Sequence, residues 1–207
     1  YTPGTGTFGM QLFGNKAVLA ASENNNGILA IDEFRQAFSL SLNRSDIVEK
    51  IWPGTSVVCL GLMNSQYYYD VENGGVYRDT KQAKEGLLRA YGFTETDGKW
   101  SNGAEITNAT LDEAYDAMTG YNPTKAKELV KKAYEILVAN AEEYGYDDTK
   151  DITFVYGSSV DTAKQRERAN YLQGVLDELC KDTALAGKIK VVFDASAGNN
   201  WADAFRS

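Results

Sequence analysis

The last third of the chain carries the pattern that most limits its fold: two short apolar runs separated by one long amphipathic segment. Residues 152–156 and 188–193 are rich in β-branched and aromatic side chains, which is typical of buried strands. Between them, residues 163–182 place apolar side chains at helical spacing. Strand, helix and strand in this order predict a βαβ unit, with parallel strands and a right-handed crossover.

The same unit predicts where a ligand would bind. In open parallel sheets, ligands bind at the loops that follow the carboxyl ends of the strands, and here those loops are residues 157–162 and 194–201. The first loop contains four candidate ligand-binding residues: Gly157, Ser158, Ser159 and Thr162. Their amide and hydroxyl groups lead into a helix amino terminus, which favours a carboxylate or a carbonyl oxygen. A solvated turn with a Ser/Thr helix cap is the alternative for this loop.

Two further candidate ligand-binding residues follow the second strand. Trp201 comes after two asparagines, and it either lines a ligand site or anchors a terminal helix in the core. Arg206 either pairs with a ligand carboxylate in a bidentate manner or is an ordinary surface residue.

Composition excludes several classes of function. The formal charge of −8 disfavours nucleic acid, because a polyanionic backbone would be repelled. Histidine is absent, which removes Ser-His-Asp and Cys-His catalysis and the commonest zinc ligand. Cys59 and Cys180 form no CxxC motif, and the sequence leaves open whether they are linked.

Two motifs keep other functions open. Residues 22–33 place asparagines, Gly27 and Glu33 at positions of a calcium loop, although Ser22 replaces the usual first aspartate. A calcium-binding or adhesion module is therefore one alternative. A carboxylate-based hydrolase is another, because adjacent acids occur at residues 112–113, 142–143 and 147–148. The polar neighbours of these acids favour a solvated acidic face instead.

The remaining patterns predict a series of short elements. Residues 5–13 alternate as a half-buried strand, and residues 94–108 contain an Asp-Gly turn typical of a hairpin. Helices are expected over 32–42, from Ser45, from residue 79 or 80, from Thr110, and from Asn122-Pro123 to about Tyr144. Three tyrosines at 67–69 fall in a long connection, where at most two of them share a face.

Four segments of this sequence resemble one protein family. Residues 34–47, Phe-Arg-Gln-Ala-Phe-Ser-Leu-Ser-Leu-Asn-Arg-Ser-Asp-Ile, are similar to the R-Q-A-x-x-x-A-[ILN]-[DN]-R-x-x-[IL] segment of the family 5 extracellular solute-binding proteins. These are the peptide- and nickel-binding receptors of ABC importers. Residues 5–12 resemble the preceding strand, and residues 121–129 resemble the helix start Y-[DN]-P-x-K-A-K-x-L-L. The βαβ unit with residues 201–206 resembles the segment before the family's G-x-[YF]-D strand.

The resemblance implies a receptor rather than an enzyme. The expected fold is an α/β lobe of the periplasmic-binding-protein-like type II class, with a mixed sheet, flanking helices and a βαβ unit near its C-terminus. Residues 1–207 would be a single domain, the C-terminal-type lobe of a larger two-lobe receptor. An oligopeptide would bind without covalent chemistry, cofactor or metal, although peptide, nickel-chelate and oligosaccharide receptors share this scaffold.

The resemblance also implies partners and a location. The partners would be the transmembrane subunits of the ABC importer and the remaining lobe of the same receptor, with no nucleic acid. The location would be extracytoplasmic, either as a cell-surface lipoprotein or in the periplasm.

Overall fold

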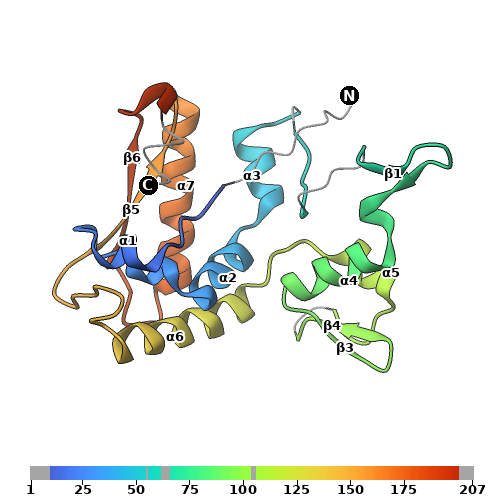
Figure 1. The fold of residues 1–207 in the computed structure, drawn as a ribbon, viewed down its shortest axis with the longest axis horizontal. Helices are drawn as coiled ribbons and strands as arrows, with labels where there is room; N and C mark the ends of the chain where they lie inside the picture. The colour runs from blue at the N-terminus through green and yellow to red at the C-terminus, as the bar shows by residue number, and fades with distance from the viewer. Residues whose placement is uncertain (1–9, 55, 62–65, 104–105, 201–207) are drawn as a thin grey trace. The chain divides into compact units, whose positions relative to one another are not determined.

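Two compact units make up the part of the chain that the structure describes. The computed structural model describes residues 10–54, 56–61, 66–103 and 106–200 (Figure 1). Met10 and residues 43–125 belong to one unit, which we call the inserted unit. The other, the split unit, consists of residues 11–42 and 126–200, so that the inserted unit interrupts its sequence.

The split unit contains the predicted βαβ unit. Its elements are α1 (Lys16–Ala20), η1 (Gly27–Ala30), α2 (Asp32–Ser41), most of α6 (Pro123–Ala139), β5 (Ile152–Gly157), α7 (Ala163–Cys180), β6 (Ile189–Asp194) and η3 (Gly198–Asn200). Strands β5 and β6 pair in parallel without a break in register, from Ile152 opposite Ile189 to Gly157 opposite Asp194. Helix α7 connects them and lies alongside both strands (Figure 1). The parallel pair with a helical crossover is therefore confirmed.

Helices and sheet enclose the core of the split unit. Leu172, Leu176 and Leu179 line the inner face of α7, at the spacing that the sequence predicts. Phe34 of α2 is fully buried, and its ring meets that of Phe154 edge-on at 5.7 Å between centroids. Burial of one such side chain stabilises the fold by about 1.5–3 kcal/mol.

A buried asparagine fastens the start of β5 to the preceding loops. Asn25 has a left-handed backbone with φ of 55°. Its side-chain oxygen accepts the backbone N–H of Asp147 at 2.8 Å, and its Nδ2 donates to the carbonyls of Asp147 at 2.9 Å and Lys150 at 3.2 Å. The carbonyl of Asn24 accepts the N–H of Thr153 at 2.9 Å. These bonds fix where β5 begins.

The inserted unit is built from short helices and two hairpins. Its elements are α3 (Arg44–Ile51), β1 (Tyr68–Asp70), β2 (Gly75–Val76), η2 (Tyr77–Asp79), α4 (Lys81–Ala90), β3 (Thr94–Thr96), β4 (Lys99–Ser101) and α5 (Leu111–Ala117). Its buried core consists of Leu88, Phe93, Trp100, Ala114 and Met118. The hairpin predicted at residues 94–108 is confirmed as β3–β4, and Trp100 turns inward from it. Trp100 is thus the aromatic anchor of this unit.

The β1–β2 hairpin carries a row of exposed tyrosines. Tyr67 and Tyr77 meet edge-on at 6.3 Å between ring centroids. The ring of Tyr69 lies across Gly75, where an added Cβ would be 2.8 Å from the tyrosine Cζ. Tyr69 is nevertheless 64% exposed, so it does not serve as a core residue.

The expectation of one mixed sheet is wrong for the described residues. Their strands form three separate two-stranded sheets, of which β1–β2 and β3–β4 are antiparallel and β5–β6 is parallel. The physical reason is local: each antiparallel pair is a hairpin of two or three residues a strand, closed by its own turn within the inserted unit. The broader α/β architecture holds, with helices and small sheets alternating along the chain.

The two cysteines are unlinked in this structure. Cys59 and Cys180 are both free thiols, and burial raises the pKa of Cys180 to about 12. Cys180 is 1% exposed on α7, as expected for a small buried hydrophobe. Most of the strand predicted at residues 5–13 lies outside the described residues, and the chain from residue 10 to residue 15 is irregular.

Candidate functional site

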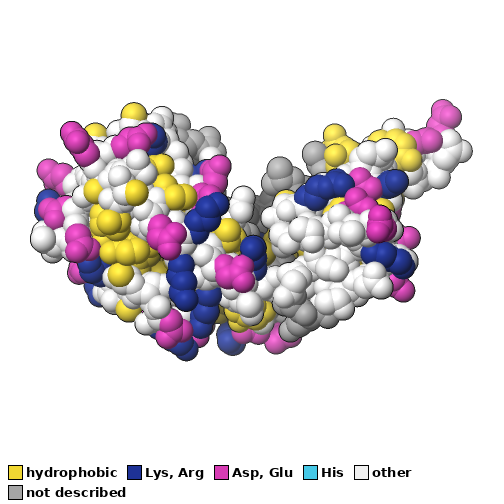
Figure 2. All heavy atoms as spheres, turned by 90° about the horizontal axis from the view of Figure 1, so that it is seen from below, with side chains coloured by type: hydrophobic (Ala, Val, Ile, Leu, Met, Phe, Trp, Pro, Cys, Tyr) yellow, Lys and Arg dark blue, Asp and Glu magenta, His cyan; other side chains and the backbone are white. Residues whose placement is uncertain are grey.

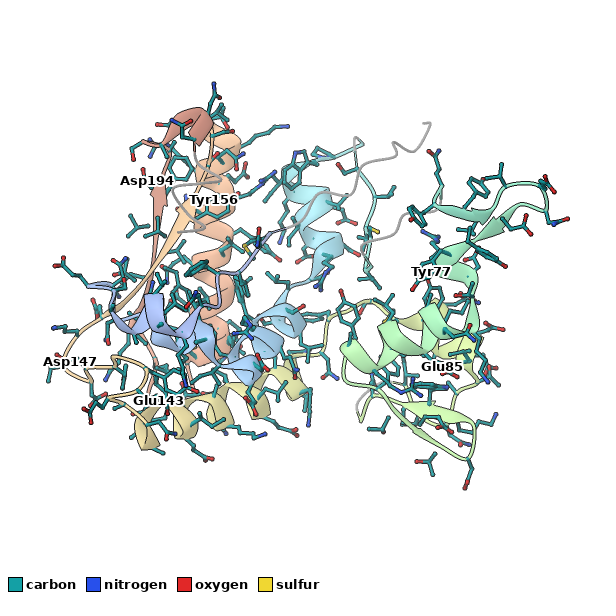
Figure 3. The ribbon with its side chains drawn as sticks, viewed as in Figure 1. Tyr77, Glu85, Glu143, Asp147, Tyr156 and Asp194 are labelled. Carbon is teal, nitrogen blue, oxygen red and sulfur yellow. The ribbon has the colours of Figure 1, made fainter. Side chains whose placement is uncertain are left out.

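The carboxyl ends of β5 and β6 form one edge, which we call the carboxyl rim: residues 157–162 and 194–200. Gly157 lies opposite Asp194 in the last pair of the sheet. The N–H of Ser158 donates to the carbonyl of Asp194 at 2.9 Å, which extends the pairing one residue into the loop. Tyr156 and Asp194 accordingly lie at the same end of the two strands (Figure 3).

The predicted residues of the first loop are brought together, but their hydroxyls differ in role. Ser158 is 5% exposed, and its hydroxyl donates to the carbonyl of Val160 at 2.9 Å and accepts the N–H of that residue at 3.3 Å. It therefore shapes the loop from inside. Ser159 is half-buried. Thr162 is exposed and caps α7, because its hydroxyl accepts the N–H of Gln165 at 3.3 Å.

A charged pair stands beside these residues. The Asp161 carboxylate accepts from Nε of Arg166 at 2.7 Å and also from its Nη2, so the contact is bidentate. The carboxylate raises the pKa of Arg166 through this hydrogen bond and through its charge. The Arg166 guanidinium also lies over the ring of Phe193, 5.0 Å from its centroid. The Arg166 side chain is thereby fixed at the carboxyl rim, with its charge paired to that of Asp161.

An aromatic and amide cluster supports the same edge. The Tyr156 hydroxyl donates to Oε1 of Gln165 at 2.9 Å and accepts from Nη1 of Arg168 at 3.0 Å. The Tyr156 and Phe193 rings come from neighbouring strands, with centroids 6.1 Å apart. These contacts fix the Tyr156 and Phe193 rings against the start of α7, at the carboxyl ends of the two strands.

The second loop supplies a fixed carboxylate. Oδ1 of Asp194 accepts the backbone N–H of Ser196 at 2.7 Å, and the amide and hydroxyl of Ser196 lower the pKa of Asp194. Helix η3 follows at Gly198–Asn200. Trp201 and Arg206 lie outside the described residues.

Sequence reasoning missed four of the groups at the carboxyl rim, namely Tyr156, Asp161, Arg166 and Phe193. Register is the signal that places the two rings together, since Tyr156 and Phe193 are opposite each other when the strands pair from Ile152 and Ile189. The charged pair has no such signal. Asp161 precedes the helix, so its five-residue spacing to Arg166 matches no helical i,i+4 pattern.

The adjacent acids of the hydrolase alternative are engaged in local structure. Glu113 closes a capping box with Thr110, and Asp112 pairs with Lys84 at 2.6 Å. Asp148 pairs with Lys188 at 2.5 Å. Hydrogen bonds lower the pKa of Glu113 and Asp148, whereas a general acid of this chemistry requires a raised pKa.

The calcium-loop alternative meets a similar obstacle. The segment at Gly27–Ala30 is a 3₁₀ helix, and Glu33 lies in α2 with its carboxylate 2.7 Å from Nζ of Lys132. Lys132 lowers the pKa of Glu33 through that contact. A calcium loop needs both oxygens of its twelfth residue as ligands. Within the described residues, no group of three or more Cys, Asp or Glu side chains is positioned to hold a metal ion.

The surface shown in Figure 2 mixes the two signs of charge. Lysine and arginine side chains are interspersed with aspartate and glutamate, without a continuous basic patch on that face. Among the helices of the described residues, none is long and apolar enough to cross a bilayer.

The family comparison decides the identity of the scaffold. The model of the bacterial extracellular solute-binding proteins, family 5 Middle, matches residues 2–203, which is nearly the whole chain. The chain belongs to family 5 of the bacterial extracellular solute-binding proteins. No curated protein and no solved structure matches it.

Membership of family 5 confirms the resemblance seen in the four sequence segments. It assigns this chain a solute-binding role in ABC import, together with a periplasmic or surface location. Family 5 proteins bind solutes and generally catalyse no reaction. The α/β architecture of this chain is compatible with a lobe of such a receptor.

Proposed function

We propose that this chain is one lobe of an oligopeptide receptor of the type II class, and that the carboxyl rim is its share of the ligand surface. The observation that carries the proposal is the in-register parallel pair β5–β6, since both strands end at Gly157 and Asp194 and so direct both following loops to one edge. The family match supplies the solute-binding role on which the proposal builds.

The chemistry of the carboxyl rim suits a peptide. A peptide backbone needs donors and acceptors that tolerate any side chain, and loop amides and hydroxyls provide them. The proposed ligand-binding residues are Gly157, Ser158, Ser159, Thr162, Trp201 and Arg206. Ser158 acts by holding the loop, because its own hydroxyl is used within it. Tyr156 and Phe193 supply an apolar wall that accepts varied side chains.

Arg166 gives the site a preference for negatively charged ligands. Its side chain is 59% exposed although it contacts Asp161, so a ligand carboxylate can share or replace that partner. A carboxylate-bearing peptide is therefore favoured over its amidated counterpart. The lobe would work with a second lobe of the same receptor and with the membrane subunits of the importer, as a periplasmic protein or a surface lipoprotein.

Calorimetric titration of short peptides into the complete receptor tests the proposal. We expect binding of a free-acid peptide, and weaker binding of the same peptide with an amidated C-terminus. Arg166→Ala should lose most of that difference, whereas Arg78→Ala, a charge removal in the inserted unit, should keep it.

Two results would count against the proposal. Failure of a broad library of peptides to bind the complete receptor would reject the oligopeptide ligand. Peptide binding that is unchanged by Arg166→Ala and by Thr162→Ala would reject the carboxyl rim as its location, while leaving the solute-binding role intact.

A further inference from the structure

Three Asn-Gly dipeptides occur in the chain, at residues 26–27, 73–74 and 102–103. Asparagine before glycine is the sequence most prone to cyclise, because glycine has no Cβ to keep its backbone nitrogen away from the asparagine side chain. The reaction also requires a backbone that can rotate and a side chain that is accessible. The structure distinguishes the three sites by these requirements.

The first site is held rigidly. Asn26 is 8% exposed, and Gly27 begins the 3₁₀ helix η1. A Cβ at Gly27 would lie 1.9 Å from the carbonyl oxygen of Tyr144, so the backbone is pressed against its neighbour. Rotation towards a cyclic intermediate would require this contact to open.

The site at residues 102–103 is also constrained, in this case by hydrogen bonds. Oδ1 of Asn102 accepts the N–H of Ile106 at 3.0 Å, and its backbone N–H donates to the carbonyl of the same residue at 3.0 Å. Its own carbonyl accepts from Nδ2 of Asn122 at 3.2 Å. Asn102 is half-buried under these contacts.

Asn73 is different because it stands at the exposed turn between β1 and β2. No atom lies within 4 Å of the position that a Cβ would occupy at Gly74, and the same is true of Gly103, but Asn73 is itself exposed whereas Asn102 is half-buried. One neighbour restrains the site. Asp70 accepts the backbone N–H of Asn73 at 3.1 Å and its Nδ2 at 2.8 Å. These two amide donors lower the pKa of Asp70, so its carboxylate is ionised at neutral pH.

We propose that Asn73 is the one of these three asparagines that deamidates in the folded chain, and that Asp70 sets the rate by holding the asparagine amide. The Gly74 nitrogen attacks Cγ of Asn73 and forms a new N–Cγ bond. The Cγ–Nδ2 bond breaks, and ammonia leaves with the proton that the Gly74 nitrogen gives up. Water then opens the cyclic imide, at one carbonyl to an aspartyl residue and at the other to an isoaspartyl residue.

The product alters the hairpin that carries the exposed tyrosines. A carboxylate at position 73 faces the Asp70 carboxylate, where an amide donated before. Like charges at that separation repel, so the contact that ties the turn to β1 is lost. The isoaspartyl product also adds a backbone atom between the strands that place Tyr67 against Tyr77. This inference is independent of the ligand proposed above.

Peptide mapping by mass spectrometry tests the assignment. Cleavage after lysine and arginine puts the three dipeptides in separate peptides, residues 17–35, 51–78 and 100–125. After incubation of the folded chain in neutral buffer, we expect deamidation and isoaspartate in the middle peptide, at Asn73, many-fold ahead of the other two. In urea, where the fold is absent, the three rates should converge.

Two variants test the role of Asp70 and of the glycine. Asp70→Ala should accelerate the reaction at Asn73 several-fold because the amide is released, and Gly74→Ala should slow it many-fold. The inference is overturned if the three sites react equally in the folded chain, or if Asn102 reacts first. A rate at Asn73 that is unchanged or slower in Asp70→Ala overturns the restraining role of Asp70.

Discussion

The side chain of Gln173 takes the place of a neighbouring strand beside Val191. Oε1 of Gln173 accepts the N–H of Val191 at 2.7 Å, while its Nε2 donates to the carbonyl of Ile189 at 2.9 Å. Both backbone groups point away from β5. The carbonyls of Lys188 and Asp194 bond to β5 and to the loop after it, and residues 189 and 191 occupy the alternate positions of the strand. The amide of Gln173 thus closes an open sheet edge, which is otherwise prone to pair with another chain.

Removing this amide should destabilise the split unit. Gln173→Ala leaves the N–H of Val191 and the carbonyl of Ile189 without their partner, and we expect a loss of about 1–3 kcal/mol. Asn170→Ala changes an exposed polar residue on the same helix and should stay within about 0.5 kcal/mol of the parent. Urea unfolding followed by circular dichroism measures both. Equal effects of the two variants would refute the edge role of Gln173.

Gln173→Glu separates the acceptor from the donor. A carboxylate still accepts from Val191, but it cannot donate to Ile189. It also faces Asp177, whose carboxylate in the parent accepts from Nε2 of Gln173 at 2.8 Å. The variant should therefore be destabilised at neutral pH and should recover as the pH falls through the carboxylate range. A pH-independent loss would show that the repulsion from Asp177 is not its cause.

Alanine substitutions at Gly145 and Gly174 should change the stability of the protein in opposite directions. A Cβ at Gly145, whose φ is +61°, would lie 2.1 Å from the carbonyl oxygen of Ala20, so Gly145→Ala forces two backbone segments apart. Gly174 lies inside α7 with no atom within 4 Å of its Cβ position. Gly174→Ala should stabilise the protein by about 0.5–1 kcal/mol, because alanine is the better helix former.

Thermal unfolding of the two glycine variants gives the comparison. We expect the transition of Gly145→Ala to fall by many degrees or to be lost, and that of Gly174→Ala to rise. A Gly145→Ala protein as stable as the parent would contradict the close approach to Ala20.

The elements that sequence analysis predicted well are those fixed by local chemistry. Asn122 caps α6, because its Oδ1 accepts the N–H of Lys125 at 3.0 Å, and Thr80 caps α4 in the same way. The βαβ unit could be predicted because both strands are short and rich in β-branched and aromatic residues, and they flank a long segment with helical spacing. Short-range signals of this kind need no knowledge of the rest of the fold.

The incorrect predictions concern positions where the structure depends on contacts that local sequence patterns do not reveal. Helix α6 was expected to reach about Tyr144, but it ends at Ala139, because the chain must turn to bring Gly145 against Ala20. The start of α3 was placed at Ser45, whereas Asn43 is the cap, its Oδ1 accepting from Asp46 at 3.3 Å. At the carboxyl rim, the loop residues were predicted from the strand ends, but the pairing of Asp161 with Arg166 depends on loop geometry that the sequence does not display.

Replacing Asn25 with an apolar residue should destabilise the protein. Asn25→Ala removes its bonds to the backbone of Asp147 and Lys150 and places a Cβ-bearing residue without a polar side chain at φ of 55°. We expect a loss of about 2–4 kcal/mol from unsatisfied buried groups and backbone strain together. Asn25→Gly relieves only the strain, so it should lie between Asn25→Ala and the parent in urea unfolding. An Asn25→Gly protein as stable as the parent would show that the hydrogen bonds contribute nothing.

Acid sensitivity of the split unit should depend on Asp148. Its carboxylate accepts from Nζ of Lys188 at 2.5 Å and from the hydroxyl of Tyr146 at 2.9 Å, and these contacts lower its pKa in the folded protein. The folded state therefore binds that proton less readily than the unfolded state. The resulting stabilisation is present above the ordinary aspartate pKa of about 3.9 and disappears as the pH falls through the lowered value. Asp148→Asn should flatten this acid limb in urea midpoints measured against pH. Asp151→Asn, on an exposed neighbour, should leave the limb unchanged, and an identical curve for parent and Asp148→Asn would contradict the coupling to Lys188.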